Sequence, residues 1–260
     1  MAKNAGRNLL GDFSAGAPYV TETRRVLQKL MRQQREGECS VYMVTSAGRS
    51  EGKSTICALL AIVAARVYQS RVLLIDADLR RPTLHGLLDV PVRPGLFEHF
   101  QLTGSLDRVC RPTWLPTLQI IPSGRGGPAA NEAYDDARFS ALIASLRPSY
   151  DMIFVDAGPV VPLVEPLMMA EHVDGLLLVT MAGKTPVPMI RRMREILTPV
   201  ASKILGVLVN NSAEGLPYFY DYTYYGYAPQ ETRHPGDKVV PPRGRGGSAS
   251  RGTSKPNLKE

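Results

Sequence analysis

Short apolar runs alternate along this chain with longer segments in which apolar residues recur at helical spacing. The apolar runs predict buried strands at residues 41–45, 72–76, 118–122, 152–156, 175–180 and 204–210. The segments between them predict helices at about residues 18–35, 54–68, 136–146, 162–171 and 187–200. Strands of this kind joined by helices are typical of a parallel sheet with both faces covered. The pattern therefore predicts an α/β fold with a doubly wound, mostly parallel sheet.

The length of 260 residues is sufficient for one such domain with tails, because an α/β domain needs roughly 150–200 residues. We assign a flexible N-terminus to residues 1–17, the folded domain to residues 18–217, a tyrosine cluster to residues 218–227 and a disordered basic tail to residues 228–260. No apolar run approaches the ~18 residues that cross a bilayer, and the N-terminus lacks a signal-peptide core. A cytoplasmic location is expected.

The formal net charge is +7, and much of the basic charge lies beyond residue 233, in a segment rich in Pro, Gly, Ser, Arg and Lys. These side chains either contact phosphates or lipid head groups, or the tail is merely solvated. No aromatic residues that stack on bases are interleaved with them, so no specific nucleic-acid binding is expected. The scattered Cys39, Cys57 and Cys110 indicate small apolar packing rather than a disulfide or a zinc site.

The most specific chemistry lies where the first strand meets the following helix. Ala47 and Gly52 bracket four residues, so the backbone N–H groups can curl around phosphate oxygens at the positive end of the helix. Lys53 then supplies a charge for the outer phosphates, and Ser54 supplies a hydroxyl for magnesium. We therefore predict a nucleotide triphosphate site rather than an ordinary turn. Its nucleotide-binding residues are Ala47, Gly48, Arg49, Ser50, Glu51, Gly52, Lys53, Ser54 and Thr55.

Two further apolar strands deliver carboxylates to the same edge of the predicted sheet. Asp76 and Asp78 follow one strand, with Arg80 close behind them. Alternation along an extended chain places both carboxylates on one side. Asp156 ends another strand and is placed to hold magnesium, directly or through water. Because ligands of open α/β sheets bind at this edge, the sequence predicts one assembled site.

Together these motifs resemble those of the bacterial tyrosine kinases, the cytoplasmic kinases of capsule and exopolysaccharide synthesis. That family shares a phosphate-loop superfamily with the septum-positioning and plasmid-partition ATPases. The resemblance covers roughly residues 21–227, and its motifs stand at residues 47–54, 76–80 and 156–159. The partition ATPases carry an extra lysine near the start of the loop, where this chain has Gly48.

Six tyrosines near the end of the resemblance look like the C-terminal cluster that these kinases phosphorylate on one another. They are Tyr218, Tyr220, Tyr222, Tyr224, Tyr225 and Tyr227. An amphipathic edge strand or an adhesive aromatic patch is the structural alternative, because tyrosine has a high β propensity.

The chain departs from the family pattern at three places, one of which is the segment after Pro122, where residues 127–132 lack the family's Asn-Pro-x-Glu-Leu motif. The family loop commonly has Pro-Gly where this chain has Arg49 and Ser50, and its ring-forming helix motif Glu-x-x-Arg-x-x-Arg becomes Glu22, Arg25 and Gln28 here. The resemblance therefore implies a homo-oligomer whose ring contact lacks one charge.

The resemblance implies transfer of the ATP γ-phosphoryl group to a tyrosine hydroxyl with Mg²⁺ as cofactor. Lys53 would neutralise the transferred group, and Ser54, Asp78 and Asp156 would organise the metal. Asp76 is the candidate for accepting the tyrosine proton, with the choice between Asp76 and Asp78 left open. Arg80 would assist nucleotide binding. Asn210, or its neighbour Asn211, would contact adenine.

The family also implies partners. These are a membrane-anchored polysaccharide co-polymerase that activates the kinase at the inner face of the plasma membrane, and a cognate tyrosine phosphatase. Two other hypotheses stay open: a positioning ATPase without kinase activity, and a non-catalytic nucleotide-sensing scaffold.

Overall fold

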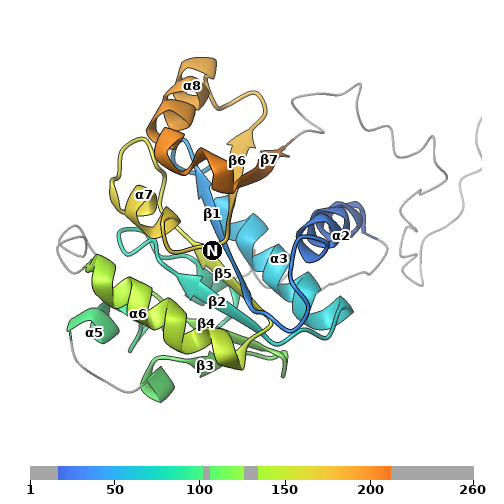
Figure 1. Cartoon of the computed structure of the whole chain (residues 1–260), viewed down its shortest axis with the longest axis vertical. Helices are drawn as coiled ribbons and strands as arrows, with labels where there is room; N and C mark the ends of the chain where they lie inside the picture. Colours follow the sequence, from blue (N-terminus) through green and yellow to red (C-terminus); the bar gives the residue numbers. More distant parts are fainter. Residues whose placement is uncertain (1–16, 102–105, 126–133, 212–260) are drawn as a thin grey trace, which may run out of the picture. The chain divides into compact units, whose positions relative to one another are not determined.

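The computed structural model describes residues 17–101, 106–125 and 134–211. Within these ranges one sheet has the strand order β3-β4-β2-β5-β1-β6-β7 (Figure 1). Its strands are β1 (Ser40–Ser46), β2 (Val72–Asp76), β3 (Arg111–Pro112), β4 (Leu118–Ile121), β5 (Met152–Asp156), β6 (Gly175–Met181) and β7 (Ile204–Asn210). Every pair is parallel except β3 with β4. The predicted mostly parallel sheet is confirmed.

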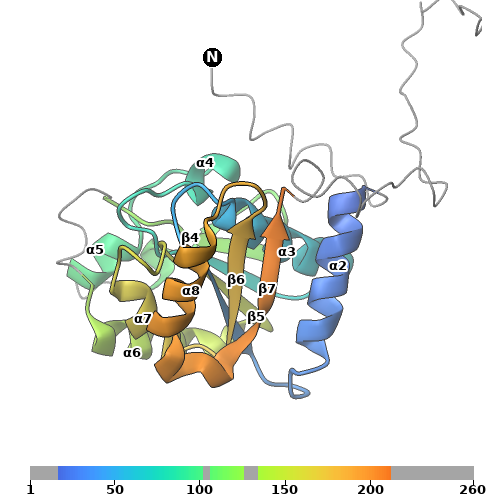
Figure 2. The ribbon, with the colours of Figure 1, turned by 90° about the horizontal axis from the view of Figure 1, so that it is seen from above.

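Helices cover both faces of the sheet (Figure 2). The helices are α2 (Pro18–Met31), α3 (Lys53–Val67), α4 (Leu84–Leu87), α5 (Leu96–Gln101), α6 (Asp136–Leu146), α7 (Glu165–Ala170) and α8 (Val187–Ile196). The side chains of α2 and α3 form one core with one face of the sheet. Those of α6, α7 and α8 form a second core with the other face. This two-sided arrangement is the doubly wound fold that the sequence predicts.

The strand boundaries follow directly from burial. All five residues of β2 and of β5 are buried, as are all seven of β1. A strand covered on both faces needs a continuous apolar run rather than an alternating one. The sequence boundaries of β2 and β5 are correct to the residue for this reason, and those of β7 and α6 are also correct to the residue.

Other boundaries differ from the prediction. The helix predicted over residues 162–171 is the short α7, and the one predicted over residues 187–200 ends at Ile196, where a 3₁₀ turn (Thr198–Lys203) containing Pro199 follows. Proline at this point cannot donate the next helical hydrogen bond. The sequence prediction missed α4, α5 and the two-residue edge strand β3, which are too short to show a period.

Several assignments from sequence lie outside the described residues. They are the N-terminus up to residue 16, the tyrosine cluster at residues 218–227 and the basic tail at residues 228–260. In the described part of the chain, no helix is both long and apolar enough to cross a membrane. Among the described residues, Cys39, Cys57 and Cys110 form no disulfide.

The helix α3 fixes the position of the phosphate-binding segment. Its residues from Cys57 to Ala65 are all buried between the sheet and α2. Alanines supply four of these positions, which lets the helix approach the sheet closely: Ala58, Ala61, Ala64 and Ala65. The first turn of α3 is thereby held at the carboxyl ends of β1, β5 and β2.

Replacing Ala61 with leucine is expected to lower the free energy of unfolding by ~1–3 kcal/mol, because a close-packed core cannot absorb extra methylene groups without strain. Urea unfolding followed by circular dichroism measures the loss. The matched change Ala201→Leu, at an exposed position, should alter stability by no more than about 0.5 kcal/mol. Equal losses in both variants would contradict the packing of α3.

Candidate active site

The phosphate loop joins β1 to α3 through a sharply curved backbone. Gly52, immediately before the first helical residue, has a φ of +87°, in the left-handed region. A Cβ atom at Gly52 would lie 2.1 Å from Nδ2 of Asn210. That amide donates to the carbonyl oxygen of Glu51 at 3.1 Å. Glycine is therefore required at residue 52 both for the turn and for the close approach of β7.

Lys53 lies among the carboxylates predicted from sequence. Its Nζ is 2.9 Å from Oδ2 of Asp78 and 3.5 Å from Oδ1 of Asp156. It also lies 3.2 Å from Oγ of Ser54. The parallel register places Asp76 beside Asp156. The structure thus brings the loop lysine and the three predicted carboxylates to one edge of the sheet.

Burial controls the ionisation of this group. Burial alone would lower the pKa of Lys53, but the charges of Asp156 and Asp78 outweigh it and hold that pKa above its ordinary value. Burial raises the pKa of Asp76 well above its usual range, and the neighbouring Asp156 adds to the shift. Burial also raises the pKa of Asp156, against the opposing charge of Lys53. Lys53 remains positively charged, while ionisation of the two buried carboxyl groups is unfavourable.

The hydrogen bonds distinguish Asp76 from Asp78. Asp76 is fully buried, and its Oδ2 accepts the backbone N–H groups of Thr83 and Leu84 at the start of α4. Asp78 instead accepts from Lys53 and from the backbone N–H of Arg81, and it faces the site's cavities. Asp78 is therefore accessible to a bound group. Asp76 instead stabilises the segment between Asp78 and the start of α4.

The same residues fit a magnesium ion shared with phosphate oxygens. Neither carboxylate oxygen of Asp156 makes a hydrogen bond, although both are buried. The Lys53 ammonium pairs with Oδ1 at 3.5 Å, and both oxygens can still accept contacts from a metal ion or a bound water. No three acidic, histidine or cysteine side chains within the described ranges are arranged to hold a metal by themselves. Ser54, Asp78 and Asp156 would therefore hold Mg²⁺ together with the nucleotide.

A cavity of about 410 Å³ opens over the loop. Its lining consists of Arg49, Ser50, Glu51, Gly52, Lys53, Ser54, Thr55, Asp78, Arg81, Thr83, Leu87 and Pro159. Of the predicted nucleotide-binding residues, Ala47 and Gly48 lie at the base of the loop and do not line this cavity. The room suits part of a nucleotide, with its phosphates over the first turn of α3.

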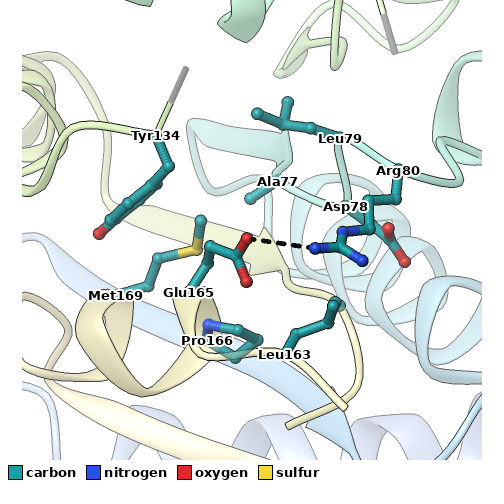
Figure 3. Close-up of a pocket in the computed structure, with 10 residues that line it drawn as sticks. Ala77, Asp78, Leu79, Arg80, Tyr134, Leu163, Glu165, Pro166 and Met169 are labelled. Carbon is teal, nitrogen blue, oxygen red and sulfur yellow. Dashed lines mark ion pairs between the residues drawn. The ribbon is translucent and has the colours of Figure 1, made fainter. Parts of the chain in front are cut away.

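Arg80 lies beside Asp78, and its side chain extends toward Glu165 (Figure 3). Its guanidinium pairs with Glu165 of α7 at 3.9 Å, beside a small second cavity that Asp78 also lines. Arg81, rather than Arg80, lines the phosphate-loop cavity, together with Arg49 of the loop itself. The backbone turns after Asp78, where the N–H of Arg81 donates to its carbonyl oxygen at 3.2 Å. Strand alternation therefore no longer predicts which side chain faces the loop.

Two residues of the loop between β6 and α8 also contact the phosphate loop, and neither is predicted from sequence. Lys184 donates to the carbonyl oxygen of Ser50 at 2.8 Å, and Thr185 donates to the Glu51 carboxylate at 2.7 Å. These residues belong to no local motif and lie more than a hundred positions from the phosphate loop. No sequence signal available in one chain could have identified them.

The fold and the site define a phosphate-loop nucleotide-binding protein of the doubly wound type. A scan against models of protein families finds no match. The septum site-determining protein MinD of Pyrococcus horikoshii OT3, solved with Mg-ADP, shares the fold with a TM-score of 0.56 at 21% identity, over 66% of this chain and 70% of that one.

Closer relatives define the family. The tyrosine-protein kinase CpsD of Streptococcus agalactiae is 30% identical over 190 residues, which are 73% of this chain and 82% of that protein. The tyrosine-protein kinase YwqD of Bacillus subtilis strain 168 is 32% identical over 184 residues, which are 71% of this chain and 76% of that protein. The solved kinase domain of the Escherichia coli tyrosine kinase ETK has a TM-score of 0.69 at 26% identity, over 81% of this chain and 80% of that one. The chain belongs to the family of bacterial tyrosine-protein kinases.

A longer relative carries the same domain as one part. The succinoglycan biosynthesis transport protein ExoP of Rhizobium meliloti strain 1021 is 32% identical over 178 residues. These residues are 67% of this chain but 22% of ExoP.

Replacing Asp156 with asparagine is expected to stabilise the nucleotide-free protein and to weaken Mg-ATP binding at least about tenfold, a change of ~1.4 kcal/mol. The pKa of Asp156 is raised in the folded state, so its ionisation destabilises the fold progressively as pH rises above the ordinary carboxyl range. At pH 7.5 with a chelator, the midpoint of thermal unfolding should rise by roughly 2–4 °C for each ~1 kcal/mol recovered.

The control is Asp151→Asn. A hydrogen bond from Arg71 lowers the pKa of Asp151, so removing this carboxylate should lower the midpoint instead. A lower midpoint for Asp156→Asn would contradict the description of Asp156 as an unsatisfied buried carboxylate.

Proposed function

We propose that this chain uses ATP and Mg²⁺ to phosphorylate its own tyrosine cluster, as part of capsular or exopolysaccharide synthesis or export. The cluster consists of Tyr218, Tyr220, Tyr222, Tyr224, Tyr225 and Tyr227. The observation that carries the proposal is the position of Asp78. This carboxylate pairs with Lys53 and lines both the phosphate-loop cavity and the neighbouring cavity beside α7.

The chemistry assigned to the residues is mainly positioning and charge neutralisation. Bound Mg²⁺ would neutralise charge on the phosphate oxygens, held by Ser54, Asp78 and Asp156. Lys53 would turn from its carboxylate partners toward the transferred phosphoryl group. The tyrosine oxygen would form a bond to the γ-phosphorus as the bond to the ADP oxygen breaks.

The tyrosine proton must pass to a carboxylate within hydrogen-bond reach. From sequence, Asp76 is the candidate acceptor and Asp78 is the alternative. The exposure of Asp78 to both cavities supports Asp78 as the direct acceptor, because Asp76 is fully buried and uses one oxygen for the start of α4. Asp76 would then position the segment that carries Asp78.

The nucleotide assignments rest on different amounts of support. Residues 49–55 line the cavity, which supports their contact with phosphates. Asn210 donates to the Glu51 carbonyl, which supports a role in fixing the phosphate loop. Contact of Asn210 with adenine is proposed in addition to this role. Arg80 would act through Glu165 rather than on the phosphates.

We infer partners from the relatives. ExoP is named as a transport protein and exceeds the matched domain severalfold in length. This supports a separate membrane-anchored polysaccharide co-polymerase that would activate this chain at the inner face of the plasma membrane. A homo-oligomer that exchanges tyrosine segments between active sites, and a tyrosine phosphatase that resets them, complete the proposal.

Incubation of the full chain with ATP and Mg²⁺, with and without Lys53→Met, tests the reaction directly. Mass spectrometry of the peptide spanning residues 216–233 should find phosphotyrosine only with Lys53 present. Removal of the charged ammonium should reduce the signal by at least ~100-fold, as for the loss of a major transition-state contact. Lys53-dependent ATP hydrolysis without phosphotyrosine, also with an activating membrane partner, would favour a positioning ATPase. Absence of both would favour a scaffold.

Replacing all six cluster tyrosines with phenylalanine is expected to prevent ATP-induced dissociation of the oligomer. Each phosphate adds about −1.5 to −2 charges, and like charges on neighbouring segments repel. Light scattering before and after addition of Mg-ATP measures the change in mass. Dissociation that is unchanged in the phenylalanine variant would contradict this regulation.

A further inference from the structure

A buried carboxylate lies inside the phosphate loop itself. Glu51 is 3% exposed, although it borders the cavity. Its Oε2 accepts the backbone N–H of Gly48 at 3.0 Å, and its Oε1 accepts the hydroxyl of Thr185 at 2.7 Å. A negative group beside a site for polyphosphate opposes ligand binding unless it is held in a fixed, compensated position.

The hydrogen-bond network fixes the direction of the Thr185 hydroxyl. The backbone N–H of Met181, at the end of β6, donates to Oγ1 of Thr185 at 2.8 Å. The hydroxyl therefore uses an acceptor site for Met181 and directs its single proton to Glu51. Thr185 is not a freely rotating surface hydroxyl but a fixed link from β6 to the phosphate loop.

Two neighbouring contacts make the link part of a larger brace. Lys184, one residue earlier, donates to the carbonyl of Ser50 at 2.8 Å. Asn210 of β7 donates to the carbonyl of Glu51. The loop after β6 is itself tied to β7, because the N–H of Ala182 donates to the carbonyl of Asn210 at 2.9 Å. The side chain and the backbone of Glu51 are thus held by two adjacent strands.

We propose that Thr185 is a positioning residue for nucleotide binding. Its hydroxyl holds the Glu51 carboxylate in the position where the other carboxylate oxygen accepts the backbone N–H of Gly48. Without this bond, one buried oxygen of the Glu51 carboxylate has no hydrogen-bond donor. The side chain of Glu51 then turns into the cavity, where water can solvate it. There its charge repels the phosphates of the nucleotide. This role deepens the proposed function, since it rests on the use of the phosphate loop for ATP.

Thr185→Val keeps the shape of the side chain and removes the hydroxyl. In the full chain, isothermal titration calorimetry should show the Kd for Mg-ADP rising about tenfold or more, the usual cost of leaving one buried polar group unpaired. Thr185→Ser, which restores the donor, should bind within about twofold of the unsubstituted chain. Thr198→Val is the matched control, because the hydroxyl of Thr198 donates to the carbonyl of Arg194 in the preceding helix α8, away from the phosphate loop.

A double variant separates repulsion from general loss of structure. Glu51→Gln removes the charge that Thr185 restrains, so adding Thr185→Val to it should weaken Mg-ADP binding less than about twofold further. If Thr185→Val weakens Mg-ADP binding only in the chain that retains Glu51, the Glu51 carboxylate is the cause of the weaker binding. Thr185→Ala replaces the valine variant, with the same criterion, if the latter does not fold as judged by its thermal midpoint.

Three results would overturn the proposal: unchanged binding in Thr185→Val, a serine variant as weak as the valine variant, or a full additional loss in the Glu51→Gln background. In kinetics, the expected defect is a raised KM for ATP with kcat nearly retained. Mg-ADP binding is measured without phosphotransfer. A chain that binds Mg-ADP but forms no phosphotyrosine would therefore count against the proposed function and leave the role of Thr185 standing.

Discussion

The charge balance around Lys53 is the constraint on which the rest of the site depends. One ammonium group stands against Asp78 and Asp156, with the carboxyl group of Asp76 next in the register of the sheet. Buried charges without full compensation are costly. Burial is the main cause of the raised pKa values of Asp76 and Asp156, and the single positive charge of Lys53 only partly opposes it. Nucleotide phosphates would add further negative charge, so the loaded site needs a cation and the positive end of α3.

The sheet order explains why these groups meet. The strand β1 lies between the central strand β5 and β6, and β2 lies beyond β5. The loop after β1 therefore crosses over the ends of β5 and β2, where Asp156 and Asp76 stand side by side. Parallel strands bring all their carboxyl ends to one edge, and the longest buried helix fixes the loop there. The alanines that let α3 pack closely against the sheet therefore also help to fix the position of Lys53, the first residue of α3, relative to the carboxylates.

The sequence could predict whatever is determined locally. Fully buried strands carry their signal in a continuous apolar run, so β2 and β5 are predicted to the residue. The phosphate loop is likewise predicted from sequence, because its residues 47–55 are contiguous in the chain. What the sequence could not predict depends on how the chain turns after a strand or on contacts between distant segments. Arg81 lines the phosphate-loop cavity where Arg80 is expected, because the backbone turns after Asp78. Thr185 contacts the loop from far along the chain.

The departure of this chain from the family loop has a physical consequence at Ser50. Its φ is +58°, in the left-handed region, where the family commonly has glycine. A side chain in that conformation costs about 1–2 kcal/mol relative to glycine. The bond from Lys184 to the carbonyl of Ser50 acts on this same residue and offsets part of the strain. The loop after β6 therefore supports the phosphate loop at the two consecutive residues where it most needs support, the strained Ser50 and the buried Glu51.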